Sequence, residues 1–421
     1  MSFIRGCMLA SAVLVFVVFS VVFRSHNTFV VAGLLLSCVF IFKSKLDITS
    51  PDLWFVVAIN IYHLSIFALD IIGFRVIENK YELTVINFFS LLGYFTASSL
   101  FVGRRVGGSF FRGDISISHR VVKFFLILLF VLTVLISVSF LLSGAVNKAE
   151  FDNQFGSVFS VFNMVFILYL LRIKKNKYMF GVIIGIGGYL LTSSLLLGER
   201  NIFLSFMLLI IFFSFRCLRV GRVKLFLMCG VLVALIPILG QFKNVFTRGG
   251  GESVGRTPII ISVLNGEFRS AGYNINHILS EDVPLKYGAS LVNDFLRVIV
   301  PRFVYPVENS VSWYNATYHP DIVAQGRGYG FSLAAEGFIN FGLAGVYAWF
   351  FLAGVLISWL YNKSYKSSFY FVIYLIMIPV FIYAVRGDFS TIFSPLLKQV
   401  LFPYLLMYIS YRFFRRVGTN L

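Results

Sequence analysis

Long apolar stretches alternate with short polar or charged segments along nearly the whole chain. Each stretch covers about 15 to 25 residues, the length that a helix needs to cross the hydrocarbon core of a bilayer. The pattern predicts an all-α polytopic membrane protein with about twelve transmembrane helices in one membrane domain. We place these spans at residues 7–23, 28–42, 53–73, 84–102, 121–143, 156–171, 178–197, 202–215, 225–240, 332–360, 369–385 and 391–411.

One long polar interval, residues 241–331, breaks this alternation. It divides the chain into residues 1–240, with spans one to nine, and residues 332–421, with spans ten to twelve. We expect this interval to be a single large loop on one side of the membrane. It also holds signals for short helices of its own.

Two segments of the loop carry helix signals. Residues 257–264 begin with Thr-Pro and end before Asn-Gly, as a short helix does. Residues 289–300 predict an amphipathic helix that lies on the membrane surface. Its apolar face is formed by Leu291, Val292, Phe295, Leu296 and Ile299.

Composition supports a membrane protein and explains the basic charge. The 421 residues are 58% hydrophobic and only 13% charged, with a mean hydropathy of +0.87 and a net charge of +18. Most Lys and Arg lie in alternate segments between the spans, which places those segments in the cytoplasm by the positive-inside rule. Both termini are then cytoplasmic and residues 241–331 lie outside. Anionic lipid headgroups are the natural partner of this charge, and nucleic acid is not.

Motifs for cofactors and processing are missing from the sequence. It contains no GxxxxGK[ST] phosphate loop, no GxGxxG after a strand and no metal-ligand spacing. The four cysteines, Cys7, Cys38, Cys217 and Cys229, lie in or beside apolar runs and form no disulfide framework. Residues 7–23 lack a small-residue cleavage site, so we interpret them as a retained first helix. We expect no cofactor and a substrate that arrives already activated.

Arginines and aromatic residues gather in the segments assigned to the outer face. Guanidinium forks suit diphosphate oxygens, and flat aromatic rings suit sugars. These arginines could instead contact headgroups or pair with neighbouring acids, and the aromatics could be interfacial anchors. The candidates are Arg200, Arg269, Arg302 and Arg386, the acid Asp388, the histidines His277 and His319, and the rings of Tyr305, Trp313 and Tyr314.

A glutamate opens span ten within the glycine-rich stretch GYGFSLAAEGFINFGLAGV, residues 328–346. Glu336 is a candidate general base, but an acid in a first helical turn can also act as a cap. The glycines before it are typical of a flexible hinge, whereas those after it could allow close helix packing. The sequence leaves these alternatives open.

Three stretches resemble the O-antigen and oligosaccharide repeat-unit polymerases of the Wzy type. They are GYGFSLAAEGFINFGLAGV after the large loop, FLRVIVPRFVYP at residues 295–306, and LLLGERNIF at residues 195–203. Arg386 also falls where such proteins often keep an arginine, whereas their paired R-x10-G loop motif is absent from residues 241–331. The resemblance implies a GT-C-like, metal-independent, inverting glycosyltransferase. It would act at the periplasmic face of the bacterial inner membrane and join oligosaccharides that are linked to undecaprenyl diphosphate.

The resemblance also implies roles for the candidates. Arg200, Arg302 and Arg386, with Arg269 as a weaker addition, would hold the diphosphate. Glu336 or His319 would act as general base, with Asp388 orienting a partner and His277 as a third possible base. Tyr305, Trp313 and Tyr314 would line the path of the glycan. A chain-length regulator protein is a further implied partner, besides the lipid-linked oligosaccharide and membrane lipids.

Two other functions fit parts of the same pattern. An O-antigen ligase shares the layout and the donor but transfers the glycan to a different acceptor. A polysaccharide transporter or flippase would usually show repeated halves and charges within its spans, and a loop as long as residues 241–331 is unusual for a carrier.

Overall fold

The computed structural model describes most of the chain, and in that part every regular element is a helix. The described residues are 26–44, 47–74, 76–101, 117–143, 156–173, 177–196, 200–218, 220–221, 223–224, 227–231, 261, 264, 268–281, 283–300, 304, 308–324 and 328–416. The expected span 7–23 and the expected loop helix 257–264 lie outside them, entirely or nearly so, as does most of the expected span 225–240.

The other expected spans all coincide with helices. In the first half these are α2 (His26–Lys43), α3 (Pro51–Ile71), α4 (Lys80–Ser99), α5 (His119–Ser143), α7 (Gly156–Leu170), α8 (Lys177–Leu196) and α9 (Arg200–Phe213). In the last third they are α16 (Leu333–Lys363), α17 (Ser368–Ala384) and the series α18 (Ser390–Pro395), a π-helical turn (Leu396–Leu401) and α19 (Phe402–Arg416).

Helix length and apolarity agree with a multi-pass membrane protein. Six helical segments of the described chain are long and apolar enough to cross a bilayer, and three shorter apolar helices accompany them. The six are Pro51–Ile71, His119–Phe140, Lys177–Leu195, Asn201–Leu218, Leu333–Lys363 and Ser390–Phe413. The described part of the chain is thus all-helical and has the helix lengths and apolarity of a membrane protein.

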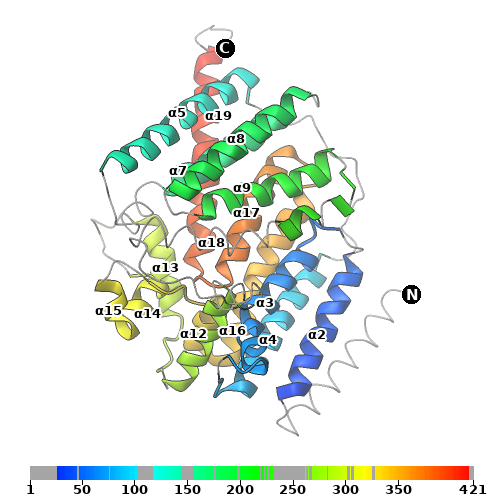
Figure 1. Cartoon of the computed structure of the whole chain (residues 1–421), viewed down its shortest axis with the longest axis vertical. Coiled ribbons are helices and arrows are strands. Elements are labelled where there is room, and N and C mark those ends of the chain that lie inside the picture. The colour runs from blue at the N-terminus through cyan, green and yellow to red at the C-terminus, as the bar shows by residue number, and fades with distance from the viewer. Residues whose placement is uncertain are drawn as a thin grey trace.

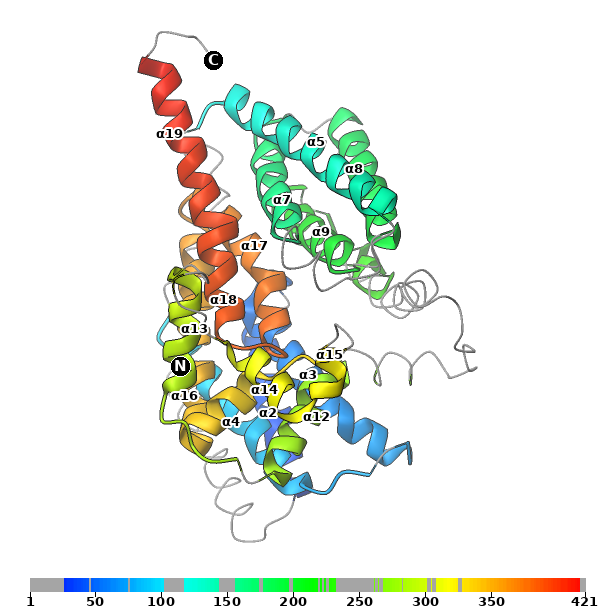
Figure 2. The same cartoon turned by 90° about the vertical axis from the view of Figure 1, so that its left-hand side faces the viewer.

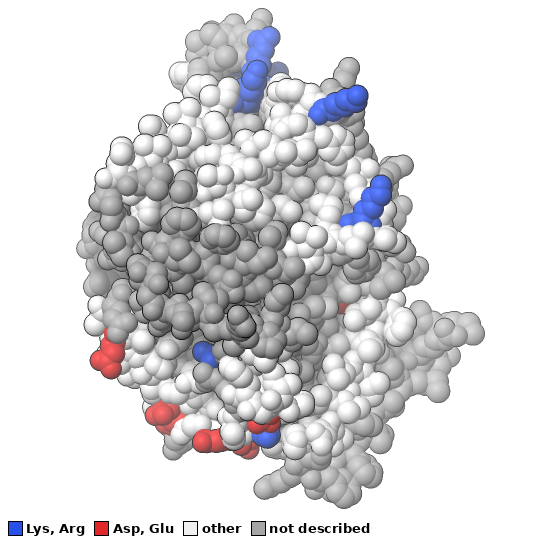
Figure 3. Space-filling model, viewed as in Figure 1, with Lys and Arg blue, Asp and Glu red and all other residues white. Residues whose placement is uncertain are grey.

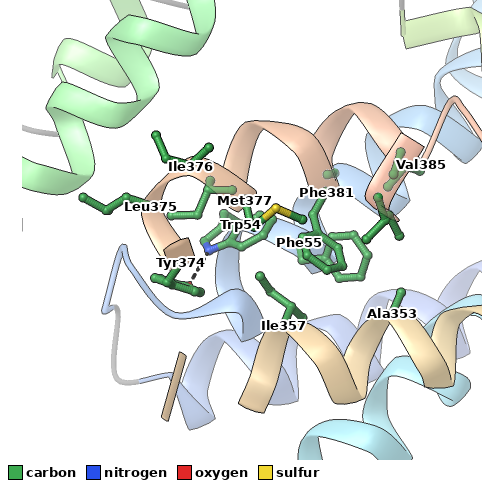
Figure 4. Packing of buried hydrophobic residues seen from close by; sticks show 14 of the residues in the cluster. Trp54, Phe55, Ala353, Ile357, Tyr374, Leu375, Ile376, Met377, Phe381 and Val385 are labelled. Atoms are coloured by element: carbon green, nitrogen blue, oxygen red, sulfur yellow. Dashed lines mark hydrogen bonds between the residues drawn. The ribbon is translucent and has the colours of Figure 1, made fainter. Parts of the chain in front are cut away.

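The centre of the molecule is formed by α3, α4, α16 and α17 (Figure 1). Phe55 of α3 packs against Phe350 of α16 and Phe381 of α17, and the Trp54 indole N–H donates a hydrogen bond of 3.2 Å to the Tyr374 hydroxyl (Figure 4). Burying these large side chains is the main force that holds the helices together at this point.

Helices α4 and α16 approach each other with almost no side chain between their backbones. A methyl group on Gly93 would lie 3.1 Å from the backbone nitrogen of Phe351, and one on Gly354 would lie 2.8 Å from the Ala97 side chain. Small residues allow such close contact between membrane helices.

A second group of helices, α5, α7, α8 and α9, lies to one side of this centre (Figure 2). Phe130 of α5 packs against Tyr189 of α8, and Phe166 of α7 packs against Phe206 of α9. Several outward side chains of α5 and α8 are exposed, which is typical of helices that face lipid.

Segments that the charge pattern assigns to the same side of the membrane meet at the same end of the molecule. At one end the Tyr361 hydroxyl donates to Asp47 over 2.6 Å, and Arg216 donates to Ser364 over 2.7 Å. At the other end Asn79 donates to Ser280 of the large loop over 2.9 Å. On the face seen in Figure 3, the described Lys and Arg lie mostly towards the α19 end and the described Asp and Glu towards the opposite end.

Helix α16 differs from the single continuous span that the sequence predicts. Phe341 and Gly342 have non-helical backbone angles, and Gly342 has a φ of 60°. The chain turns back there, so that Gly337 before the break touches Gly345 after it. Gly337 and Gly345 therefore allow two helical segments to pack closely, the role that the sequence suggests for the glycines after Glu336.

The described residues of the large loop form four short helices: α12 (Arg269–Ser280), α13 (Ala289–Ile299), α14 (Ser310–Tyr318) and α15 (Pro320–Ala324). The amphipathic helix expected at residues 289–300 is confirmed as α13. Its apolar residues Val292, Phe295 and Ile299 are about half exposed, whereas its opposite face, with Ser290 and Asp294, is buried. The polar face of α13 therefore points into the protein.

Candidate active site

The segment from Gly328 to Ser332 links the candidate residues at the end of the molecule where the large loop lies. The backbone N–H of Tyr329 donates to the Asn315 side chain of α14 over 2.7 Å, and the Tyr329 carbonyl accepts from the same side chain over 2.8 Å. Gly330 lies so close to the Arg386 carbonyl that a methyl group would approach it to 2.9 Å. Ser332 then caps α16 through the backbone N–H of Ala335.

His319 stands beside this segment at the end of α14. Its ring lies 4.7 Å from the Tyr329 ring between centroids, and its Nε2 lies 3.3 Å from the Tyr314 hydroxyl. That hydroxyl donates its hydrogen to Asn274 Oδ1 over 3.1 Å, so it can only accept from His319. The proton of a neutral His319 therefore sits on Nε2, and Nδ1 offers a lone pair.

The surroundings of His319 keep its ring neutral. Partial burial, and secondarily the neighbouring His277, lower the pKa of His319 below its usual 6.5. The two histidine rings lie 5.4 Å apart between centroids. A neutral imidazole with a bare Nδ1 has the protonation state that a general base needs.

Glu336 lies completely buried at the start of α16. Its Oε1 accepts hydrogen bonds from the hydroxyls of Ser290, over 3.1 Å, and Ser310, over 3.2 Å. Its Oε2 accepts from the backbone N–H of Phe389 over 2.8 Å. The carboxylate thus ties α13, α14 and the turn before α18 to α16, whereas the cap of its own helix is Ser332.

Asp388 lies in that turn and is also fully buried. One oxygen accepts from Asn309 Nδ2 over 2.6 Å and from the Val311 backbone N–H over 3.3 Å. The other accepts from the Ser390 hydroxyl over 2.7 Å and from the N–H and hydroxyl of Thr391 over 3.0 and 2.8 Å. Asp388 therefore joins the start of α14 to the start of α18.

A third buried carboxyl group, Asp294, completes the cluster, and the sequence analysis missed it. It projects from the polar face of α13 and is 1% exposed. It accepts from the backbone N–H groups of Ser310, over 3.1 Å, and Ser390, over 3.3 Å. The signal was present, since Ser290 and Asp294 occupy the polar face of the predicted amphipathic helix, but exposure to water was the simpler interpretation.

Lys286 faces this carboxylate cluster and was missed as well. Its Nζ lies 2.9 Å from the centre of the Trp313 ring, and its charge is attracted by Glu336 and Asp294. Partial burial nevertheless lowers the pKa of Lys286 to about 8. Its backbone N–H donates to the Ile339 carbonyl over 2.7 Å. The break in α16 makes this carbonyl available to a partner outside the helix.

Of the four expected arginines, Arg269 and Arg386 have described side chains. Arg386 is half-buried, lies 4.5 Å from the centre of the Tyr383 ring and acts electrostatically on Tyr62. Arg269 lies 5.6 Å from the centre of the Tyr273 ring at the start of α12. The side chain of Arg200, the first residue of α9, lies outside the description, as does Arg302.

The expected aromatic residues take different positions. Trp313 is partly exposed and carries Lys286 on its face. Tyr314 is completely buried, where it bonds Asn274 and packs 4.9 Å from the Phe331 ring between centroids. Tyr305 lies outside the described residues. In the described part, no group of three or more His, Cys, Asp or Glu is placed to hold a metal ion.

These features define a multi-pass helical membrane protein with a buried carboxylate cluster and a neutral histidine at one end of its helices. The family model described as O-antigen polysaccharide polymerase Wzy matches residues 288–416. This match confirms the resemblance of the chain to the Wzy-type O-antigen polymerase family. It covers α13 to α19 and therefore contains His319, Glu336, Asp388 and Arg386. Neither curated proteins nor solved structures gave a match.

Proposed function

We propose that this chain polymerises oligosaccharide repeat units linked to undecaprenyl diphosphate at the periplasmic face of the bacterial inner membrane. The observation that carries the proposal is the coincidence of the polymerase family match with the helices that bring His319, Arg386 and the carboxylate cluster to one end of the molecule. The reaction transfers the growing glycan from its carrier to the sugar of a new lipid-linked unit. In this proposal the chain has twelve spans, a GT-C-like fold and both termini in the cytoplasm.

The residues divide into those that meet substrate and those that hold the site. Arg386, with Arg200, Arg302 and Arg269, stabilises the charge that develops on the departing diphosphate. A lipid diphosphate leaves readily, so the attacking sugar hydroxyl needs only a base and correct placement. A chain-length regulator, which is a separate protein, acts on the same glycan polymer.

Of the two bases that the sequence leaves open, the geometry favours His319. Its Nδ1 carries a lone pair, and burial keeps the ring neutral. Glu336 is enclosed by two serine hydroxyls and a backbone N–H, so its role here is to organise the loop helices. The Tyr329 ring contacts the His319 ring, and the next residue, Gly330, lies against the Arg386 backbone. His319 and the Arg386 backbone therefore contact adjacent residues of the chain.

Gel analysis of lipopolysaccharide from a strain that lacks this chain tests the proposal. The deletion strain should show core bearing a single repeat, and complementation should restore a ladder of long polymer. The Arg386→Ala variant should reach the membrane and restore only the single-repeat band. Arg412→Ala is a matched control, since Arg412 lies at the opposite end of the molecule and bonds Tyr408. Complete loss of attached glycan in the deletion strain would indicate a ligase instead.

A further inference from the structure

Three buried carboxyl groups share one small region at the outer end. Asp294, Glu336 and Asp388 are each at most 1% exposed and come from α13, α16 and the turn before α18. Like charges that cannot reach water repel strongly, so such groups do not all ionise together. In the part of the chain that the structure describes, Lys286 is a cation that faces them, and it is only half-buried. The cluster therefore has a strong reason to retain a proton.

The hydrogen bonds indicate which carboxyl group retains it. A carboxylate is stabilised by each donor that points at it. From residues that the structure describes, Asp388 accepts five hydrogen bonds, of 2.6 to 3.3 Å, and Glu336 accepts three, of 2.8 to 3.2 Å. Asp294 accepts two, of 3.1 and 3.3 Å, both from backbone N–H groups. Asp294 is the least stabilised anion of the three.

We propose that Asp294 is a neutral carboxylic acid. Its O–H donates a hydrogen bond to Glu336, and it accepts hydrogen bonds from backbone N–H groups of α14 and α18. In this role it is a positioning residue. It fixes the position of α14, which His319 directly follows, relative to the turn that carries Arg386 and Asp388. The proposal deepens the proposed polymerase function, on which the role of these two elements in catalysis rests.

The groups around Asp294 are consistent with this assignment. Asp294 and Glu336 lie within hydrogen-bonding reach of each other. Burial raises the pKa of Asp294 well above its usual 3.8, and the charges of Asp388 and Glu336 raise it further. Of the elements packed on α13, α18 carries no ionisable side chain. On α13 itself, Arg297 bonds Ser312 over 3.3 Å.

A carboxamide tests the idea because it has nearly the same shape as a neutral acid, and its NH₂ can donate to Glu336 in place of the acid O–H. Each Asp294 oxygen accepts one backbone N–H, so the NH₂ leaves one of these donors unpaired, a loss that does not depend on pH. Between the ordinary pKa of an aspartate and the raised pKa of Asp294, the folded parent keeps the Asp294 proton that its unfolded chain releases. The stability of the parent therefore falls as pH rises from the ordinary pKa towards the raised pKa of the folded state. The Asp294→Asn variant has no such proton, so its unfolding midpoint relative to that of the parent should rise as pH rises.

The measurement is thermal unfolding of the full-length protein in detergent between about pH 5 and about pH 9, where a raised carboxyl pKa acts on stability. From the acid to the alkaline end, the midpoint of Asp294→Asn should rise by about 2 °C or more relative to that of the parent. Lys286 is present in both proteins and largely cancels from the difference. Asp294→Ala lacks the donor and acceptor, so its midpoint should lie below that of Asp294→Asn at every pH.

Asp388→Asn provides the contrast, since one amide cannot accept the five hydrogen bonds of that carboxylate. Its midpoint should fall and its strain should make no long polymer. If the difference in midpoint between Asp294→Asn and the parent does not change with pH, Asp294 is ionised and the proposal is wrong. If the parent itself makes no ladder, the polymerase function fails, and the pH dependence of the midpoint still decides the state of Asp294.

Discussion

Gly337 and Gly345 touch each other backbone to backbone, although the same separation along a straight helix would place them about 12 Å apart. A methyl group on Gly337 would lie 2.8 Å from the carbonyl carbon of Gly345. The contact exists because α16 turns back at Phe341 and Gly342. It brings Glu336 over the loop helices and exposes the Ile339 and Asn340 carbonyls to Lys286 and Tyr287.

This contact predicts that Gly345→Ala destabilises the protein. The added methyl group has no space against Gly337, and overpacking of this kind typically costs about 1–3 kcal/mol. The unfolding midpoint of the detergent-purified variant should fall. Gly185→Ala is the control, because a methyl group there meets nothing within 4 Å, and alanine is the better helix former. Equal midpoints for the two variants would contradict the turned-back geometry.

Glu336→Gln should lower stability and polymer yield together. The carboxylate accepts from Ser290, Ser310 and the Phe389 backbone, and a carboxamide presents its own N–H₂ to part of this donor set. Leaving a buried donor unpaired costs about 1–3 kcal/mol. Thermal unfolding and the lipopolysaccharide ladder should be measured on the same variant. A normal midpoint combined with complete loss of polymer would instead assign the base role to Glu336.

The sequence predicted the helices well because bilayer-length apolar runs and basic flanking residues are local signals. The ten expected spans in the described chain all coincide with helices, and α13 begins and ends within a residue of its expected limits. The break in α16 was not predicted. It depends on the contact between Gly337 and Gly345, and isolated glycines occur in many unbroken membrane helices.

The candidate site was predicted only in part, for a related physical reason. Glu336 and Asp388 stood out as acids beside apolar runs, and His319 stood out as a histidine among the aromatic residues of the large loop. Asp294 did not, because an acid on the polar face of an amphipathic helix normally faces water. Only the tertiary contacts turn that face inward, onto Ser310 and Ser390. Lys286 was missed because its partners, Trp313 and the carboxylates, come from distant parts of the chain.

His319→Gln should abolish polymerisation while leaving the fold intact. Glutamine can still donate to the Tyr314 hydroxyl as Nε2 does, but it supplies no base, and loss of general-base catalysis typically costs about 10²–10⁴ in rate. The assay uses lipid-linked repeat units extracted from the deletion strain. His119→Gln is the control, since His119 is exposed and stacks on Tyr169 far from the site.

The pH dependence of the parent should carry the same signature. A base works in its deprotonated form, so the rate should fall as pH drops through the pKa of His319. Because burial and His277 lower that pKa, the acid limb should lie below the usual 6.5 of histidine. The small residual rate of His319→Gln should lack this limb. An acid limb that survives in the variant would contradict the role of His319.

Lys286→Met should separate stability from activity. Burial lowers the pKa of Lys286 to about 8, so the folded protein holds this charge at a cost in free energy. The methionine variant should therefore unfold no lower than the parent at neutral pH, yet form less polymer, because it loses the cation that faces Glu336 and Asp294. Between about pH 8 and the usual 10.5 the folded parent binds fewer protons than its unfolded chain, so the stability of the parent rises with pH. The difference in unfolding midpoint between the parent and Lys286→Met therefore narrows. Lys286→Arg keeps its charge and its contact with Trp313, so it should retain polymer but show no such rise. A methionine variant with a full ladder would show that the charge is dispensable.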